Sequence, residues 1–237
     1  MEIFIPGNSR GHANHGWLDS YHTFSFADYY DPKRVNFGAL RVLNEDVIAP
    51  GMGFGTHGHD NMEIITIPLT GSLAHKDSMG NSSSIIAGEV QVMSAGTGVR
   101  HSEYNASEKD PVHLLQIWVF PRKREVAPRY DQKLFDADKT NTWQLLVSAD
   151  ETEGALMVHQ DTFFSMTRMD ENTYLEYKVK KEGNGVFFML LNGKVNIGDH
   201  ALEEKDAFAA DDKTAYTIQA LEKSQVLAIE VPMEVKW

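Results

Sequence analysis

The sequence contains no cysteine, and this absence excludes several kinds of site. A chain without cysteine has no disulfide framework, no thiolate metal site and no catalytic thiol. Its ten histidines, together with Asp and Glu, are therefore the side chains that any metal chemistry must use. Imidazole and carboxylate ligands suit ions such as iron, zinc, copper and nickel.

Positive charge and long apolar runs are also scarce. The chain has 22 Lys and Arg against 34 Asp and Glu, which gives a formal net charge of −12. Such a field repels phosphate backbones, so we expect no direct nucleic-acid partner. No stretch approaches the ~18 to 20 apolar residues of a membrane span, and residues 1–9 do not resemble a secretion signal. We therefore predict a cytoplasmic protein that does not contact a membrane.

Short β-rich runs that end in Gly, Asn, Asp or Pro recur along the whole chain, whereas sustained helical periodicity is rare. This texture is typical of an all-β sandwich or barrel. One short helix is predicted at Pro128–Phe135. The predicted strands are Gly38–Ala49, Met62–Leu69, Ser72–Lys76, Val90–Ser94, Leu114–Phe120, Gln144–Val147, Leu156–Gln160, Phe163–Arg168, Tyr174–Val179, Val186–Leu191, Lys194–Ile197, Ala207–Ala209, Ala215–Gln219 and Val226–Val231.

The two halves of the chain resemble each other weakly. Ile67–Leu73 aligns with Met189–Val195, each a strand, a glycine turn and a strand. A length of 237 residues also suits two modest domains. We predict a duplicated antiparallel β-barrel: an N-terminal domain at 1–121, a connection at 122–140 and a C-terminal domain at 141–237.

Two short dyads, His57-Gly58-His59 and His101-Ser102-Glu103, supply three imidazoles and one carboxylate. Residues at i and i+2 of a β-strand share one face, so two neighbouring strands would bring all four side chains to one ion. An ion that prefers six ligands would keep about two positions open for water, O2 or substrate. The aligned part of the second half has Lys178–Lys181 and Thr217 or Ile218 instead. We therefore place the metal in the N-terminal half.

The glycine-punctuated surroundings of these dyads resemble the cupin motifs, and in particular those of the pirin-type bicupins. The first motif is carried by Gly51, His57-Gly58-His59, Glu63 and Gly71, and the second by Gly88, Ser94–Glu103 and Asn105. The pirin branch is indicated by the Ala-Gly-x-Gly-x-x-His-Ser-Glu string at 95–103 and by Gly16–Phe26. Ser94 replaces the proline that cupins usually carry at this position.

The resemblance implies an all-β bicupin of two jelly-roll barrels with few helices, in which His57, His59, His101 and Glu103 bind one divalent metal ion. Fe(II) is the expected ion, with Zn, Mn, Co, Ni or Cu as other options. Glu63, the carboxylate ligand of ordinary cupins, is not expected to bind the metal here. The implied activity is a dioxygenase that cleaves a flavonol such as quercetin with O2, with Glu103 as ligand, general base or both.

A second hypothesis is a metal- or redox-sensing regulatory protein that uses the bicupin to bind a protein partner, because fold alone does not decide function. We expect a monomer in either case. Several further residues have two open interpretations. Asn105 either orients a ligand or shapes a turn, and Phe24, Phe26, Phe37 and Phe54 line a pocket or fill the core. Surface or hydrogen-bonding roles are expected for His12, His15 and His22, and structural or exposed positions for His75, His113, His159 and His200.

Overall fold

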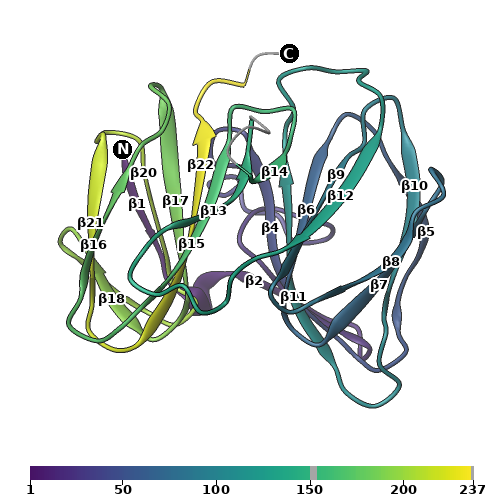
Figure 1. The fold of residues 1–237 in the computed structure, drawn as a ribbon, viewed down its shortest axis with the longest axis horizontal. Coiled ribbons are helices and arrows are strands. Elements are labelled where there is room, and N and C mark those ends of the chain that lie inside the picture. The colour runs from purple at the N-terminus through teal and green to yellow at the C-terminus, as the bar shows by residue number, and fades with distance from the viewer. Residues whose placement is uncertain (150–153, 236–237) are drawn as a thin grey trace.

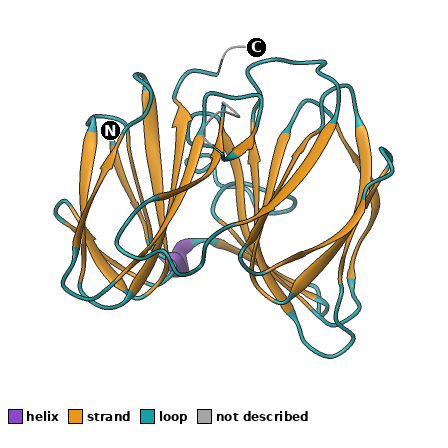
Figure 2. Cartoon of the chain, viewed as in Figure 1, coloured by secondary structure: helices purple, strands orange, loops and turns teal. Residues whose placement is uncertain are grey.

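The computed structural model describes residues 1–149 and 154–235, and it contains two β-barrels side by side (Figure 1). Each barrel combines a seven-stranded and a four-stranded sheet, and every strand pair is antiparallel except β13 with β14. The predicted all-β bicupin is confirmed. Among the described residues the sole helix is a single 3-10 turn at Gly7–Ser9, which Figure 2 shows between the barrels. None of them forms a helix long and apolar enough to span a membrane.

The N-terminal barrel carries the two dyads. Its larger sheet has the order β12 (Arg129–Leu134), β9 (Glu89–Ser94), β6 (Glu63–Thr70), β11 (Val112–Val119), β4 (Leu40–Ile48), β3 (Leu18–His22) and β2 (Gly11–Asn14). Its smaller sheet has the order β5 (Gly53–His59), β10 (Val99–Asn105), β7 (Ser72–Asp77) and β8 (Ser82–Ile86).

The C-terminal barrel repeats this plan. Its larger sheet consists of β1 (Glu2–Ile5), β20 (Ala207–Ala210), β17 (Asn184–Asn192), β22 (Ser224–Pro232), β15 (Phe163–Met169), β13 (Gln144–Ser148) and β14 (Leu156–Met157). The smaller one consists of β16 (Tyr174–Lys178), β21 (Ala215–Ala220), β18 (Lys194–Ile197) and β19 (His200–Glu203). Aromatic side chains fill its interior, with Tyr177, Phe188, Phe208 and Tyr216 in one buried cluster. Tyr177 and Tyr216 are paired on β16 and β21, which come first and second in the order of their sheet, as β5 and β10 do in the N-terminal barrel.

Two segments differ from the sequence predictions. The helix predicted at Pro128–Phe135 is wrong, because residues 129–134 form strand β12, which pairs with β9 along the edge of the N-terminal sheet. Residues 2–5, assigned to the N-terminal domain, form strand β1, which pairs with β20 of the C-terminal sheet, Glu2 opposite Ala210. In Figure 1 this first strand lies among the strands of the C-terminal barrel. Both segments are edge strands, and their partners lie far away in the sequence.

The two larger sheets pack face to face and form the main hydrophobic core. Leu43, Ile65 and Leu115 meet Phe164 and Phe187 there, and all of them are fully buried. Phe24 and Phe37 belong to the same core, so the core interpretation of these two rings is correct. Burying a large apolar side chain contributes about 1.5 to 3 kcal/mol, so this contact holds the barrels in one arrangement.

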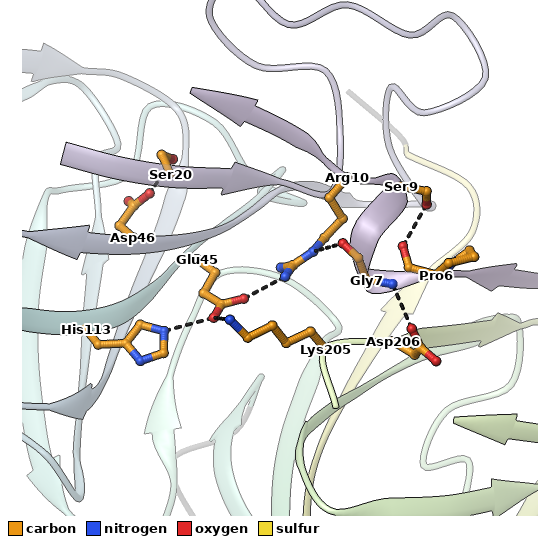
Figure 3. Close-up of polar contacts among 10 residues, drawn as sticks. All are labelled: Pro6, Gly7, Ser9, Arg10, Ser20, Glu45, Asp46, His113, Lys205 and Asp206. Carbon is orange, nitrogen blue, oxygen red and sulfur yellow. Dashed lines mark hydrogen bonds and ion pairs between the residues drawn. The ribbon is translucent and has the colours of Figure 1, made fainter. Parts of the chain in front are cut away.

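A buried ion-pair network ties the barrels together at one end of this core (Figure 3). Glu45 of β4 accepts hydrogen bonds from Arg10 at 2.7 Å and from His113 at 2.9 Å, and Lys205 of the C-terminal barrel lies 3.2 Å from the same carboxylate. Burial alone would raise the pKa of Glu45, but these three partners outweigh burial and lower it to about 2. His113 thus has a structural role, as predicted.

Candidate metal centre

Strands β5 and β10 place the two dyads next to each other. The register pairs His101 with His57, and the i, i+2 spacing puts His59 and Glu103 on the same inner face as their dyad partners. The ladder then shifts, so that Glu103 lies opposite Phe54. The extra residue belongs to β5, because two residues of β10 span three of β5, whereas β10 keeps a regular register with β7. Sequence spacing predicted that each dyad shares one face of a strand, and the structure adds the register and the bulge.

Three histidines meet at the mouth of the N-terminal barrel. Potential ligand atoms of His57, His59 and His101 all lie within 4.8 Å of one another. The Nε2 atoms of His57 and His101 are 3.0 Å apart. Two ligands at about 2.1 Å from one ion and at right angles are about 3 Å apart, so this pair has the spacing of a shared ion. His57 Nδ1 donates to the carbonyl of Gly55 at 2.9 Å, which leaves Nε2 free to bind.

Glu103 is not part of this group of three histidines. Its carboxylate belongs to a second group of potential ligand atoms, together with His75 and His101, again within 4.8 Å of one another. Gln116 donates to Glu103 Oε2 at 3.0 Å, and Thr66 in turn donates to Gln116 at 3.2 Å. The structure thus brings His57, His59 and His101 together, and it places Glu103 beside His101 and His75. Among the described residues, both ligand groups lie in the N-terminal barrel.

Burial sets the charge state of these groups. It lowers the pKa of His101 to about 3 and that of His59 to about 4, with the neighbouring histidines adding to the effect. Both rings are therefore neutral at pH 7, the form that binds a metal ion. Burial also raises the pKa of Glu103 to about 7, against the opposing hydrogen bond from Gln116. Glu103 is thus poised to take or give a proton near neutral pH.

Glu63 lies on the face of β6 that points away from the interior of the N-terminal barrel. Ile65 and Ile67 of β6 pack in the core between the barrels, whereas Thr66 reaches Gln116 inside the N-terminal barrel. Glu63 shares the face of Ile65, and its carboxylate accepts a hydrogen bond from Ser94 at 2.6 Å. Burial raises its pKa to about 7. The serine that replaces the usual cupin proline thus binds the carboxylate that usual cupins use as a ligand.

A cavity of about 820 Å³ opens onto the histidines. Its size lies within the range of small-molecule sites, which is about 300 to 1,000 Å³. Most of its surface is apolar, and polar side chains from β3, β4 and β11 lie at its base. The lining includes Trp17, Phe26, Tyr29, Phe54, Trp118, Ser20, Asn44, Asp46, Gln116, Glu103, His57 and His59. Phe26 and Phe54 therefore line a pocket, as one of their two interpretations held.

The remaining sequence candidates have other contacts. His12 Nε2 lies 2.5 Å from Asp19, and His22 bonds Ser20 at 2.8 Å, so hydrogen-bonding roles are correct for both. His12, His15 and His22 also line the cavity, which spacing alone did not reveal. Asn105 donates to the carbonyls of Ile48 and Asp110 and accepts from the backbone N–H of Ser107. It thus shapes a turn, and none of these three bonds reaches a histidine.

Sequence reasoning missed His75, Asp77 and Gln116. His75 and Asp77 are also spaced i, i+2, and both are buried on β7 beside β10. The same spacing could have signalled them, but no glycine-rich motif surrounds them. Gln116 carries no such signal, since it is one polar residue within the apolar strand β11.

Fold and site together define the class: a bicupin in which one barrel carries a histidine-rich pocket. The family described as Pirin matches residues 6–119, and the one described as Quercetinase C-terminal cupin domain matches residues 145–231. The chain belongs to the pirin family. It is 47% identical to an Escherichia coli protein named quercetin 2,3-dioxygenase, over 98% of this chain and 99% of that protein.

A further relative and a solved structure agree with this assignment. A Caulobacter vibrioides protein named pirin-like protein is 37% identical over 95% of this chain and 97% of its own length. The crystal structure of the Escherichia coli bacterial pirin YhhW in complex with nickel(II) is 44% identical, with a TM-score of 0.93, and covers 98% of this chain and 99% of that one. The expected pirin-type bicupin is therefore confirmed.

Proposed function

We propose that this protein is a metal-dependent dioxygenase that opens the central ring of a flavonol such as quercetin with O2. The observation that supports it is the convergence of three imidazoles, two of which line the apolar cavity. His57, His59 and His101 would hold one divalent metal ion, with Glu103 as the fourth ligand. The relatives point in the same direction, since one is named quercetin 2,3-dioxygenase and a bacterial pirin has a crystal structure in complex with nickel(II).

The protein's own residues would prepare the substrate in two ways. The apolar walls of the cavity, including Trp118 and Phe54, would exclude water and hold the flat rings of the flavonol. Glu103, with its pKa raised to about 7, would take the proton of the flavonol hydroxyl onto Oε1, because Oε2 already accepts from Gln116. The metal ion, when bound, supplies a Lewis acid for that hydroxyl oxygen.

Iron is the ion that we propose, and metal analysis of protein purified without added metal tests it. The activity is tested by incubating iron-loaded protein with quercetin and O2, with loss of the flavonol absorbance and release of carbon monoxide as readouts. His101→Ala is expected to lose both metal and turnover. Full flavonol cleavage by a metal-free His101→Ala protein would refute the proposal.

If the iron-loaded protein does not cleave quercetin, the alternative function is that of a regulatory metal sensor. Such a protein would bind metal, show no turnover and bind a partner in a way that follows the oxidation state of the metal. The apolar cavity at the histidines favours the enzyme, since a sensor requires a metal-dependent change at the surface.

A further inference from the structure

Strand β7 carries a third dyad, His75 and Asp77, directly beside the metal-binding strand β10. The register pairs Asp77 with His101 and His75 with Glu103. Paired residues of neighbouring strands project to the same face, so this dyad lies next to two proposed ligands. The centroids of the His75 and His101 rings are 5.3 Å apart. The ring of Tyr130 stacks on the ring of His75, with 4.7 Å between their centroids.

Three polar atoms in this layer have no hydrogen-bond partner within the described part of the chain. They are Nδ1 of His75, Nδ1 of His101 and Oε1 of Glu103, each completely buried. One ring nitrogen of each histidine and one carboxylate oxygen lie within 4.8 Å of one another. A buried polar atom without a partner costs about 1 to 3 kcal/mol, so three neighbouring ones indicate bonds that form in another state of the site.

Asp77 determines which nitrogen of His75 carries the hydrogen. Asp77 Oδ1 accepts the backbone N–H groups of Met79 and Asn81 at 2.9 and 3.0 Å, and Oδ2 accepts the side-chain amide of Asn81 at 2.8 Å. His75 Nε2 lies 3.2 Å from Oδ2. A carboxylate only accepts, so Nε2 of His75 must donate, and Nδ1 of the neutral ring keeps a bare lone pair.

His101 needs the opposite arrangement. A metal ion bound at Nε2, beside Nε2 of His57, requires a lone pair there and leaves the hydrogen on Nδ1. Ligating histidines almost always donate that second N–H to an acceptor. His75 Nδ1 and Glu103 Oε1 are both acceptors in the same layer. With the other tautomer of His75, two N–H donors would face each other.

We propose that Asp77 and His75 are positioning residues that hold His101 in its metal-binding tautomer. In the loaded protein Nδ1 of His101 donates to Nδ1 of His75, directly or through one water molecule. The chain Asp77, His75, His101 then extends from the turn at 77–81 to the metal ion. This inference rests on the metal site of the proposed function, but not on the flavonol reaction.

The test compares Asp77→Asn with wild-type protein. In the variant the turn still requires an acceptor for Met79 and Asn81, so the new amide nitrogen faces His75 and moves its hydrogen to Nδ1. Long-range ¹H–¹⁵N spectra of the zinc-loaded proteins report the tautomers. We expect His75 to carry its hydrogen on Nε2 in wild type and on Nδ1 in the variant, with zinc affinity lower by roughly 10- to 100-fold in chelator competition.

Two more variants complete the experiment. Asn81→Ala removes a donor to the same carboxylate without reversing its polarity, so the His75 tautomer and the zinc affinity should both stay close to wild type. His75→Phe keeps the stacking on Tyr130 but removes the acceptor, so zinc affinity should fall as in Asp77→Asn. It also keeps the test decisive if Asp77→Asn does not fold.

The proposal is overturned if His75 carries its hydrogen on Nδ1 in zinc-loaded wild type, or if His75→Phe binds zinc as tightly as wild type. An equal loss of affinity in Asn81→Ala would also overturn it, because the effect would then belong to the turn. Turnover is not a readout here. A protein with the expected tautomers and no flavonol cleavage would refute the proposed function alone.

Discussion

Replacing Glu45 by Gln tests how strongly the buried ion-pair network holds the two barrels together. Arg10, His113 and Lys205 lower the pKa of Glu45 from 4.5 to about 2 despite its burial. A change of this size corresponds to about 3 kcal/mol of unfolding free energy. Glu45→Gln should lose this amount at pH 7, and its Tm should fall by roughly 6 to 12 °C for a chain of this size.

The pH dependence gives the experiment its sign. Because the pKa in the folded state lies below the unfolded value, the contribution of Glu45 is complete above pH 4.5 and disappears as the pH falls through about 2. Urea unfolding followed by tryptophan fluorescence, on metal-free protein from pH 7 down to pH 3, should show the two proteins converging. A gap below 1 kcal/mol at pH 7, or one that does not narrow in acid, would refute the reasoning.

Glu203→Gln is the matched control. Glu203 pairs with Lys194 at 3.0 Å, but its side chain is 74% exposed. Solvent-exposed ion pairs contribute about 0 to 1 kcal/mol, so this variant should stay near wild type at every pH. A loss equal to that of Glu45→Gln would show that burial of the network is not what matters.

Three further outcomes are expected. Zinc at about 100 times its Kd should raise the Tm by roughly 5 to 10 °C in wild type and leave His101→Ala unchanged in thermal scans. Gly53→Ala should weaken zinc binding in chelator competition, because the new Cβ would lie 2.2 Å from the carbonyl oxygen of Glu103. Gly58→Ala is the control and should bind zinc normally, because the atom nearest to its Cβ would be 3.8 Å away. Glu63→Gln should keep wild-type zinc affinity. Burial raises the pKa of Glu63 from 4.5 to about 7, so ionisation of Glu63 destabilises the folded wild type as the pH rises. In urea unfolding, the free energy of unfolding of the variant should therefore gain up to about 3 kcal/mol relative to wild type between pH 5 and pH 8.

The sequence predicted most of the larger sheets, because their strands are apolar runs bounded by turn residues. The helix at Pro128–Phe135 was wrong for a physical reason. Residues 129–134 are half-exposed and polar, so their local pattern carries no clear period, and pairing with β9 decides their conformation. Strands β5 and β10 were not predicted for the same reason, because they are polar and do not form apolar runs. The dyads on them were recognised nevertheless.

The metal centre divides in the same way. Short-range spacing predicted that His57 and His59, and His101 and Glu103, would share faces. It could not predict that β7 lies beside β10, and so it did not connect His75 to Glu103. Nor could it predict the bulge in β5 that places Glu103 opposite Phe54. Register between strands that are distant in sequence decides both features.

The exchange of β1 into the C-terminal barrel has a consequence for how this chain can be divided and made. No single cut near residue 121 yields two complete barrels, since one product would keep β1 and the other would keep its partner β20. On the ribosome, Glu2–Ile5 emerge long before residues 207–210, so β1 has no strand partner until most of the chain has been made. Completion of the C-terminal barrel therefore requires the first residues of the chain as well as the last third of it.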